Sequence, residues 1–207
     1  MSGFFYYLLT FAESVTSVFG VRLPYDQPRY VVIQDLGQNV EIRQYDRRLE
    51  IQATIDNPDR QQAAREAFEL LFRYITGANR SDQKIAMTVP VQINNERIPM
   101  TVPVQTNPDQ GNVTMSFFQP NSIAEAGAPK PLDPRLHLVE VPASTIATLR
   151  YSGVATQDTT DRRAAELLAV LATSNWKPLG KIFQLNYDPP FAIPFLRRNE
   201  VAVTVSR

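Results

Sequence analysis

The sequence contains no cysteine and only one histidine, His137. Without cysteine, the chain can form no disulfide bond, thiolate metal site, thiolate-ligated haem or cysteine nucleophile. With one histidine, a metal site built from several imidazoles is excluded, and a serine–histidine–carboxylate triad would have to use His137. These two counts remove many of the usual catalytic arrangements.

Neither an excess of charge nor a membrane-spanning apolar run is present. The 21 basic and 21 acidic residues balance, whereas nucleic-acid binding needs a basic excess on one face, so we expect no nucleic-acid partner. The apolar segment Gly3–Ala12 ends at Glu13, short of the roughly 20 residues that a transmembrane helix needs. The first basic residue is Arg22, which does not fit the early positive charge of a signal peptide.

The N-terminal segment nevertheless predicts an apolar helix over about Phe4–Phe19, because apolar residues recur there at helical spacing. The helix either packs on its own domain, or lies on a membrane surface or docks on another protein. We therefore divide the chain into residues 1–24, an apolar helix with a linker, and residues 25–207, the domain that follows. The expected location is the cytoplasm or the soluble interior of an organelle, peripheral to a membrane under the second interpretation. The helical stripe consists of Phe4, Leu8, Phe11, Val15 and Val18.

The first half of the domain predicts strands on both sides of one helix. β-Branched residues flank Gly37-Gln38, which is typical of two strands around a tight turn. Asn57-Pro58-Asp59 opens a helix at Arg60–Ile75, and Gly77 closes it. The face expected to be buried on this helix carries Ala64, Ala67, Phe68, Leu71 and Ile75. Strands are expected at 29–36, 39–45, 49–55, 85–93, 97–105 and 113–119, and a proline-rich loop at 121–135.

The second half repeats this order at an offset of about one hundred residues. VEIRQYDRRLEIQATI has the pattern of LHLVEVPASTIATLRY, and AAREAFELL that of AAELLAVLA. We interpret residues 29–119 and 136–207 as an internal repeat of a strand–strand–helix–strand–strand unit. Because half-units of this size bury too little surface alone, we predict an α+β fold: a distorted antiparallel β barrel of two pseudo-symmetric halves with two flanking helices.

The hexapeptide MTVPVQ occurs twice, starting at Met87 and at Met100. In an extended strand each copy presents a methionine and a valine to one side of the sheet. Pro90 and Pro103 are expected at edges or bends, because proline donates no ladder hydrogen bond. The copies are either ordinary core strands or the lining of an adaptable apolar seam.

Several motifs, taken together, resemble the SOUL haem-binding protein family. They are YVVI and VEIRQY, YITGAN followed by KIAMTVPV, LRYSG, YDPPF and RRNEV, in that order between Arg29 and Val205. The resemblance implies the barrel described above. It also implies non-covalent binding of haem or another tetrapyrrole in an apolar groove beside the first barrel helix, where basic side chains meet the propionates. Such a protein would be a carrier, buffer or sensor.

On the helix Arg60–Ile75, Arg65 and Phe72 flank the predicted buried face one above the other, and Phe68 borders them. An aromatic surface beside a guanidinium suits a flat anionic macrocycle. Alternatively, Arg65 is a surface charge paired with Glu69, and Phe72 is simply core. The predicted cofactor-binding residues are Arg65, Phe68, Phe72, Arg73, Met87, Phe191 and Phe195, the last two on an opposing wall in the segment Pro190–Arg198.

An axial iron ligand is not evident from the sequence. His137 is the only imidazole, but a lone histidine on a strand is more often structural. Tyr74, Tyr151 or Met87 could substitute. We therefore expect weak or absent axial ligation and retention of the macrocycle by apolar burial.

Two other functions remain open. One is a tetrapyrrole-modifying enzyme with Glu69 or Asp188 as acid or base, which we favour less because neither lies in a catalytic motif. The other is a non-catalytic docking subunit of a membrane-associated complex, held by Phe4–Phe19. Asp188 is expected to cap a turn, and Glu200 to pair with Arg197 or Arg198.

Overall fold

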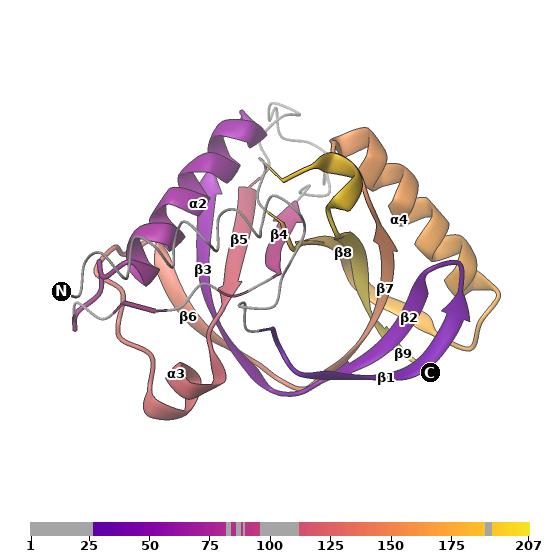
Figure 1. Cartoon of the computed structure of the whole chain (residues 1–207), viewed down its shortest axis with the longest axis horizontal. Coiled ribbons are helices and arrows are strands. Elements are labelled where there is room, and N and C mark those ends of the chain that lie inside the picture. Colours follow the sequence, from indigo (N-terminus) through magenta and orange to yellow (C-terminus); the bar gives the residue numbers. More distant parts are fainter. Residues whose placement is uncertain (1–26, 82–83, 86–87, 89, 96–111, 189–191) are drawn as a thin grey trace, which may run out of the picture. The chain divides into compact units, whose positions relative to one another are not determined.

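The computed structural model describes residues 27–81, 84–85, 88, 90–95, 112–188 and 192–207 (Figure 1). These form two compact units. Unit 1 contains the described residues of 31–44 and 145–207, and unit 2 those of 27–30 and 45–144. The predicted helix at Phe4–Phe19, the second MTVPVQ copy, Met87 and Phe191 lie outside the described residues. Within the described part of the chain, no helix is long and apolar enough to cross a membrane.

Unit 2 is an antiparallel sheet covered by one helix. The strand order is β4-β5-β3-β6, and every neighbouring pair in it is antiparallel. Helix α2 packs across β3 and β5 (Figure 1). The core beneath it includes Ile51, Met115 and Phe117, all less than 5% exposed. The strands are β3 (Arg48–Asp56), β4 (Val91–Asn95), β5 (Asn112–Phe118) and β6 (Leu136–Val141).

Helix α2 spans Arg60–Ile75, as predicted. Asp59 caps its N-terminus, because the Asp59 carboxylate accepts hydrogen bonds from the N–H groups of Gln61 and Gln62. Gly77 follows the helix with φ 119°, the left-handed conformation that glycine adopts easily. The buried side chains of α2 are Ala63, Ala67, Leu70, Leu71, Tyr74 and Ile75.

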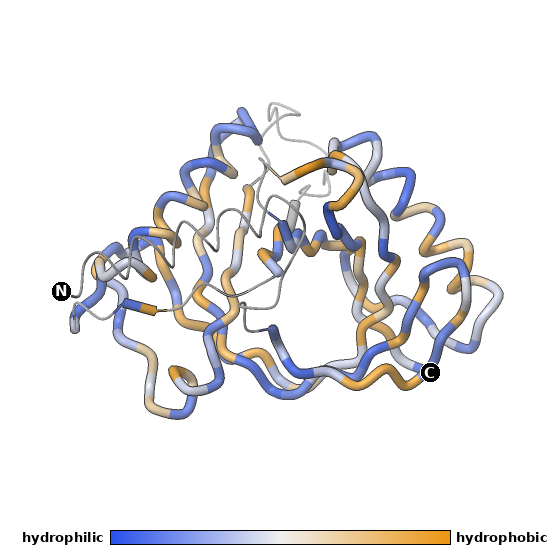
Figure 2. Tube along the Cα trace, viewed as in Figure 1, coloured by the Kyte–Doolittle hydropathy of each residue, from blue (hydrophilic) through white to orange (hydrophobic). Residues whose placement is uncertain are grey.

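The predicted buried face of α2 was therefore partly wrong. The true face is rotated toward Leu70 and Tyr74, so that Phe68 is exposed instead of buried. Composition alone favours Phe68 over Tyr74 as core, since Tyr carries a polar group. The tertiary structure resolves this, because the Tyr74 hydroxyl donates a 2.8 Å hydrogen bond to the Pro129 carbonyl. Figure 2 shows hydrophobic and hydrophilic residues alternating along α2.

Two connections of unit 2 differ from the prediction. The expected loop at 121–135 begins with a short helix, α3 (Asn121–Ala126). Its prolines lie before and after NSIAEA, so the segment is free to complete a turn of helix, and Ile123 packs against the core. The strand expected at 85–93 begins only at Val91, directly after Pro90. Asn94 and Asn95, which lie between the strands expected at 85–93 and 97–105, continue β4 and pair with β5.

Unit 1 contains the other five strands and its own helix. The strand order is β1-β2-β7-β9-β8. Helix α4 (Gln157–Ala172) packs on β8 and β9 (Figure 1). The core beneath α4 includes Ile42, Leu167 and Val201, which are fully buried. The other elements are β1 (Tyr30–Gly37), β2 (Val40–Tyr45), β7 (Ser144–Tyr151), β8 (Lys177–Asn186), the 3-10 helix η1 (Pro194–Leu196) and β9 (Asn199–Ser206).

The turn between β1 and β2 lies one residue later than predicted. Its two central residues are Gln38 and Asn39, with φ 53° and 62°. Positive φ at both central residues is typical of a type I′ turn, whose twist matches that of the flanking strands. Gly37, also at positive φ, is the last residue of β1, so the glycine lies beside the turn and not at its centre.

The α+β class with antiparallel strands is confirmed. In each unit, however, the strands run in a line that does not close on itself, so neither unit is a barrel by itself. The element order strand–strand–helix–strand–strand occurs as β2-β3-α2-β4-β5 and as β6-β7-α4-β8-β9. Corresponding strands hold the same place in β6-β3-β5-β4 and in β2-β7-β9-β8. This order agrees with the internal repeat, which stays a prediction.

Candidate functional site

The exposed face of α2 carries two stacked phenylalanines, Phe68 and Phe72. Their ring centroids lie 6.0 Å apart with an interplanar angle of 12°. Phe68 is 38% exposed and Phe72 is 46% exposed. We call this pair the aromatic platform. The interpretation of Phe72 as simple core is therefore wrong.

The platform follows from the spacing of the two residues and from one buried ring beneath them. Residues four apart lie one above the other on a helix, so the two rings can stack. The edge of Phe68 meets Phe117 of β5, whose ring centroid is 5.6 Å away at 68°. Phe117 is 1% exposed, so it anchors Phe68 from the core. Full burial of such a side chain contributes roughly 1.5–3 kcal/mol to stability. Because Phe72 is partly exposed, it contributes only part of this.

Arg65 lies on the same stripe of α2 as the platform, three residues before Phe68 and seven before Phe72. Its side chain is exposed. Among the described residues, Arg65 makes no hydrogen bond or ion pair, so the alternative pairing with Glu69 is not formed. A guanidinium without a partner beside an aromatic surface can receive a carboxylate.

Arg73, by contrast, lies near a charged cluster formed by Arg135, Asp133 and Glu66. Arg135 contacts Asp133 at 2.8 Å and Glu66 at 2.7 Å. Hydrogen bonds from Arg135, assisted by the nearby charges of Arg135 and Arg73, lower the pKa of Asp133 to about 2. Arg73 is therefore exposed but faces a negative neighbour, which makes it a poorer receptor for an anion than Arg65.

Two of the residues suggested as iron ligands, His137 and Tyr74, are not directed at the platform. His137 of β6 is opposite Gln52 in the sheet, while its neighbours Leu136 and Leu138 pack into the core beneath α2. Since successive side chains of a strand point to opposite faces, His137 lies on the face away from α2. Tyr74 is fully buried, and burial raises the pKa of its phenol to about 12. Tyr151 is also buried, in unit 1.

Of the remaining predicted site residues, the structure describes only Phe195. Phe195 lies in η1 of unit 1 and is 73% exposed. Met87 and Phe191 fall outside the described residues. The opposing wall formed by the segment 190–198 stays a prediction.

A buried charged network in unit 1 was only partly predicted. The expected pair of Arg198 with Glu200 is present at 2.6 Å. The larger contribution comes from Arg43, which the sequence analysis missed and which binds Glu200 with two hydrogen bonds. The Tyr187 hydroxyl adds a third donor at 3.0 Å. The only signal for Arg43 is a charge within a β-branched strand, and its partner is 157 residues away in the sequence.

The network holds its carboxylate ionised. Burial by itself would raise the pKa of Glu200, but the hydrogen bonds and charges from Arg43 and Arg198 outweigh it and lower that pKa. Arg198 also stacks on the Tyr187 ring at 3.9 Å, and its N–H donates to the Asp188 carboxylate at 2.6 Å. Asp188 thus closes the loop before β9, which agrees with its predicted structural role.

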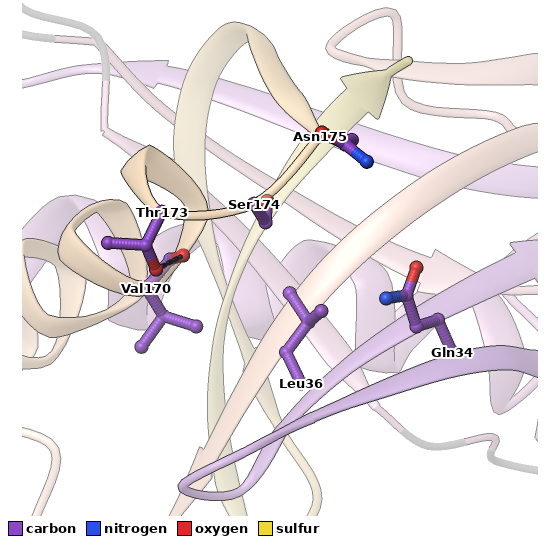
Figure 3. A pocket seen from close by; sticks show the side chains of 6 residues that line it. All are labelled: Gln34, Leu36, Val170, Thr173, Ser174 and Asn175. Atoms are coloured by element: carbon purple, nitrogen blue, oxygen red, sulfur yellow. Dashed lines mark hydrogen bonds between the residues drawn. The ribbon is translucent and has the colours of Figure 1, made fainter.

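A shallow pocket of about 310 Å³ also lies in unit 1. Figure 3 shows Gln34 and Leu36 of β1 facing Val170 and the residues that follow α4. The hydroxyls of Thr173 and Ser174 already donate to carbonyl groups of α4. The pocket therefore offers little free hydrogen-bonding capacity and is not the predicted groove.

The fold and the platform define an α+β protein with antiparallel sheets and an exposed aromatic surface beside an arginine. Residues 25–204 match the family described as SOUL heme-binding protein. The chain belongs to the SOUL haem-binding protein family.

Two similar proteins are both named heme-binding protein 1. The one from Sus scrofa is 28% identical over 151 residues, covering 72% of this chain and 76% of the relative. The one from Xenopus tropicalis is 26% identical over 165 residues, covering 80% and 83%. Among solved structures, the EcmrR C-terminal domain matches with a TM-score of 0.58 at 9% identity, covering 81% of this chain and 97% of that domain. That likeness concerns the fold alone.

Proposed function

We propose that this chain binds haem or a related tetrapyrrole non-covalently, with the macrocycle lying against the aromatic platform of α2. The observation that carries this proposal is the exposed stack of Phe68 and Phe72 beside Arg65, which has no partner among the described residues. Membership of a haem-binding family supports the ligand class. A carrier or buffer role fits a binding surface that lies at the exterior of unit 2.

The residues of the platform fit the chemistry of a tetrapyrrole. Such a macrocycle is flat and apolar with carboxylates at one edge. Stacked rings provide the apolar surface, and the Arg65 guanidinium is suited to a carboxylate. His137 lies on the other face of the sheet, so binding would rest on apolar contact and charge. When bound, haem would bring its own redox-active iron and visible absorbance.

Absorbance titration with haemin and with metal-free protoporphyrin tests the proposal. We expect saturable binding near one pigment per chain for both, weakened by Phe72→Ala and by Arg65→Glu. Similar affinity for the two pigments would indicate that the iron contributes little. Matched controls lie on α4, where Leu168 is 39% exposed and Arg162 is exposed. Leu168→Ala and Arg162→Glu should leave the titration unchanged.

The outcomes separate the site from the function. Absence of saturable binding for both pigments would overturn the proposed function. Binding that survives both α2 changes would keep the function and reject the platform as its site. Binding lost equally in the α4 controls would show that the effect is not specific to α2.

Neither alternative function is favoured by a described contact. Glu69 is exposed on α2, and the Asp188 carboxylate accepts a hydrogen bond from the Arg198 N–H, so no described contact singles out either one as an acid or base. The membrane or protein-docking role rests on Phe4–Phe19, outside the described residues, and stays a prediction. Fractionation of the full chain with and without lipid vesicles would test it.

A further inference from the structure

Strand β1 is an apolar edge. It ends the strand order and, among the described strands, pairs only with β2. Val31, Val32 and Ile33 are 67%, 44% and 45% exposed. Exposed edges are usually protected by proline, lysine or a bulge, but YVVIQDLG contains neither proline nor lysine. Such an edge is a template for another strand.

A backbone hydrogen bond shows which groups of this strand face β2. The Arg29 carbonyl, directly before β1, accepts from the N–H of Asp46, directly after β2. Backbone groups alternate in direction along a strand, so the N–H and C=O groups of the odd-numbered residues face β2. Those of Val32, Gln34 and Leu36 face the open edge.

We infer that two copies of this chain associate by antiparallel pairing of their β1 strands about a two-fold axis at Val32. Val32 then lies opposite Val32 of the second copy as a hydrogen-bonded pair. Val31 lies opposite Ile33 of the second copy, so β-branched side chains meet on both faces of the joined sheet. A two-fold axis requires the same patch on both copies, and one strand supplies it.

Charge selects this register. With Val32 at the axis, Arg29 of each copy lies opposite Asp35 of the other, which forms two ion pairs. Arg29 and Asp35 are exposed, and among the described residues Asp35 bonds only the Gly37 N–H in its own turn. The neighbouring permitted register, with Ile33 at the axis, places Asp35 opposite Val31 and leaves both charges unpaired. The complementarity of a strand with itself points to a second copy instead of an unrelated partner.

Single cysteines test the register without interference, because the chain has no cysteine of its own. Hydrogen-bonded pairs have Cα atoms about 5.5 Å apart, within the range of a disulfide. Val32→Cys should therefore form a disulfide-linked dimer under mild oxidation. Ile33→Cys is the matched control, since in this register its partner cysteine is diagonal, at about 8 Å. Efficient linkage of Ile33→Cys with none of Val32→Cys would overturn the register.

Sedimentation velocity of the full chain over a range of concentrations tests the association itself. We expect reversible dimerisation, with a dissociation constant raised about tenfold by Asp35→Arg or Arg29→Asp. The double variant Arg29→Asp/Asp35→Arg should restore it, because the exchanged charges still meet. This restoration also controls for the loss of the Asp35 hydrogen bond to Gly37.

A monomer at every concentration would overturn the inference. So would dimerisation that the single charge changes leave unaltered, because another surface would then be responsible. Association that mild detergent abolishes and the charge variants do not affect would place the contact on a different apolar segment, with the same consequence. A second, different protein bound to β1 in place of a copy would also reject it.

Discussion

Arg43 of β2 and Glu200 of β9 form a bidentate ion pair inside unit 1. Their nitrogen and oxygen atoms lie 2.7 and 3.1 Å apart. The side chains are 2% and 0% exposed. The two strands are separated by β7 in the sheet, so the pair ties together strands that share no backbone ladder. A charge buried this completely is tolerated only when its partners are in place.

Arg43→Ala should lower the free energy of unfolding by about 3–5 kcal/mol, because Glu200 would lose its bidentate partner while remaining buried. Urea unfolding followed by circular dichroism measures this. The control is Arg47→Ala in unit 2, where Arg47 and Glu140 are 74% and 69% exposed. That exposed pair should cost no more than about 1 kcal/mol. Equal losses in the two variants would contradict the importance of burial.

Glu200 should make stability depend on acid pH. Its pKa in the folded protein is lowered from the usual 4.5, so folding favours the ionised form. The stabilisation is fully present above pH 4.5 and is lost as the pH falls through the lower folded value. Glu200→Gln should be less stable than the parent at neutral pH, and the difference should narrow in acid. A difference that stays constant with pH would show that the carboxylate charge is not the cause.

The aromatic platform should be nearly dispensable for folding. Phe72 is 46% exposed, whereas its neighbour Leu71 is fully buried. We expect Phe72→Ala to reduce the free energy of unfolding by less than about 1 kcal/mol, and Leu71→Ala by about 2–5 kcal/mol because it leaves a cavity. Thermal and urea unfolding of both variants provide the comparison. A large loss for Phe72→Ala would mean that its effect on pigment binding reports unfolding.

Substitutions in the β1–β2 turn should change the stability of the protein in both directions. Gln38 and Asn39 both have positive φ, for which Asn-Gly is the preferred sequence. Gln38→Asn combined with Asn39→Gly should raise the free energy of unfolding by about 1 kcal/mol. Asn39→Val should lower it, because a β-branched side chain is strained at positive φ. Urea midpoints at unchanged slope would test both directions, and a loss from the Asn-Gly variant would contradict the turn assignment.

Local structure was largely predictable from the residues. The bounds of α2 followed from Asp59 and Gly77, because capping groups act within one helical turn. The strand at β3 followed from its alternation, and the α+β class from the order of helices and strands. The short helix α3 was missed because prolines on both sides gave its segment the composition of a loop.

The side of α2 that turns inward was less predictable. Phe68 is the more apolar residue, but Tyr74 is buried because Pro129 accepts its hydroxyl hydrogen bond. Helical spacing brings Phe68 and Phe72 together on one stripe, as the stacked rings show, and their role in binding stays a prediction. Their exposure depends on how α2 rotates over β3 and β5, which no local pattern encodes.

The sequence by itself determined helix α2, most of the described strands, the α+β class, the family and the shared stripe of Phe68 and Phe72, because these depend on contacts a few residues apart. Only the tertiary structure decided that Arg43 and Glu200 meet, that His137 lies on the face away from α2, and that β1 is an open edge. Those facts depend on strand order and on pairings between residues about one hundred or more positions apart. Which distant residues come together depends on the whole fold.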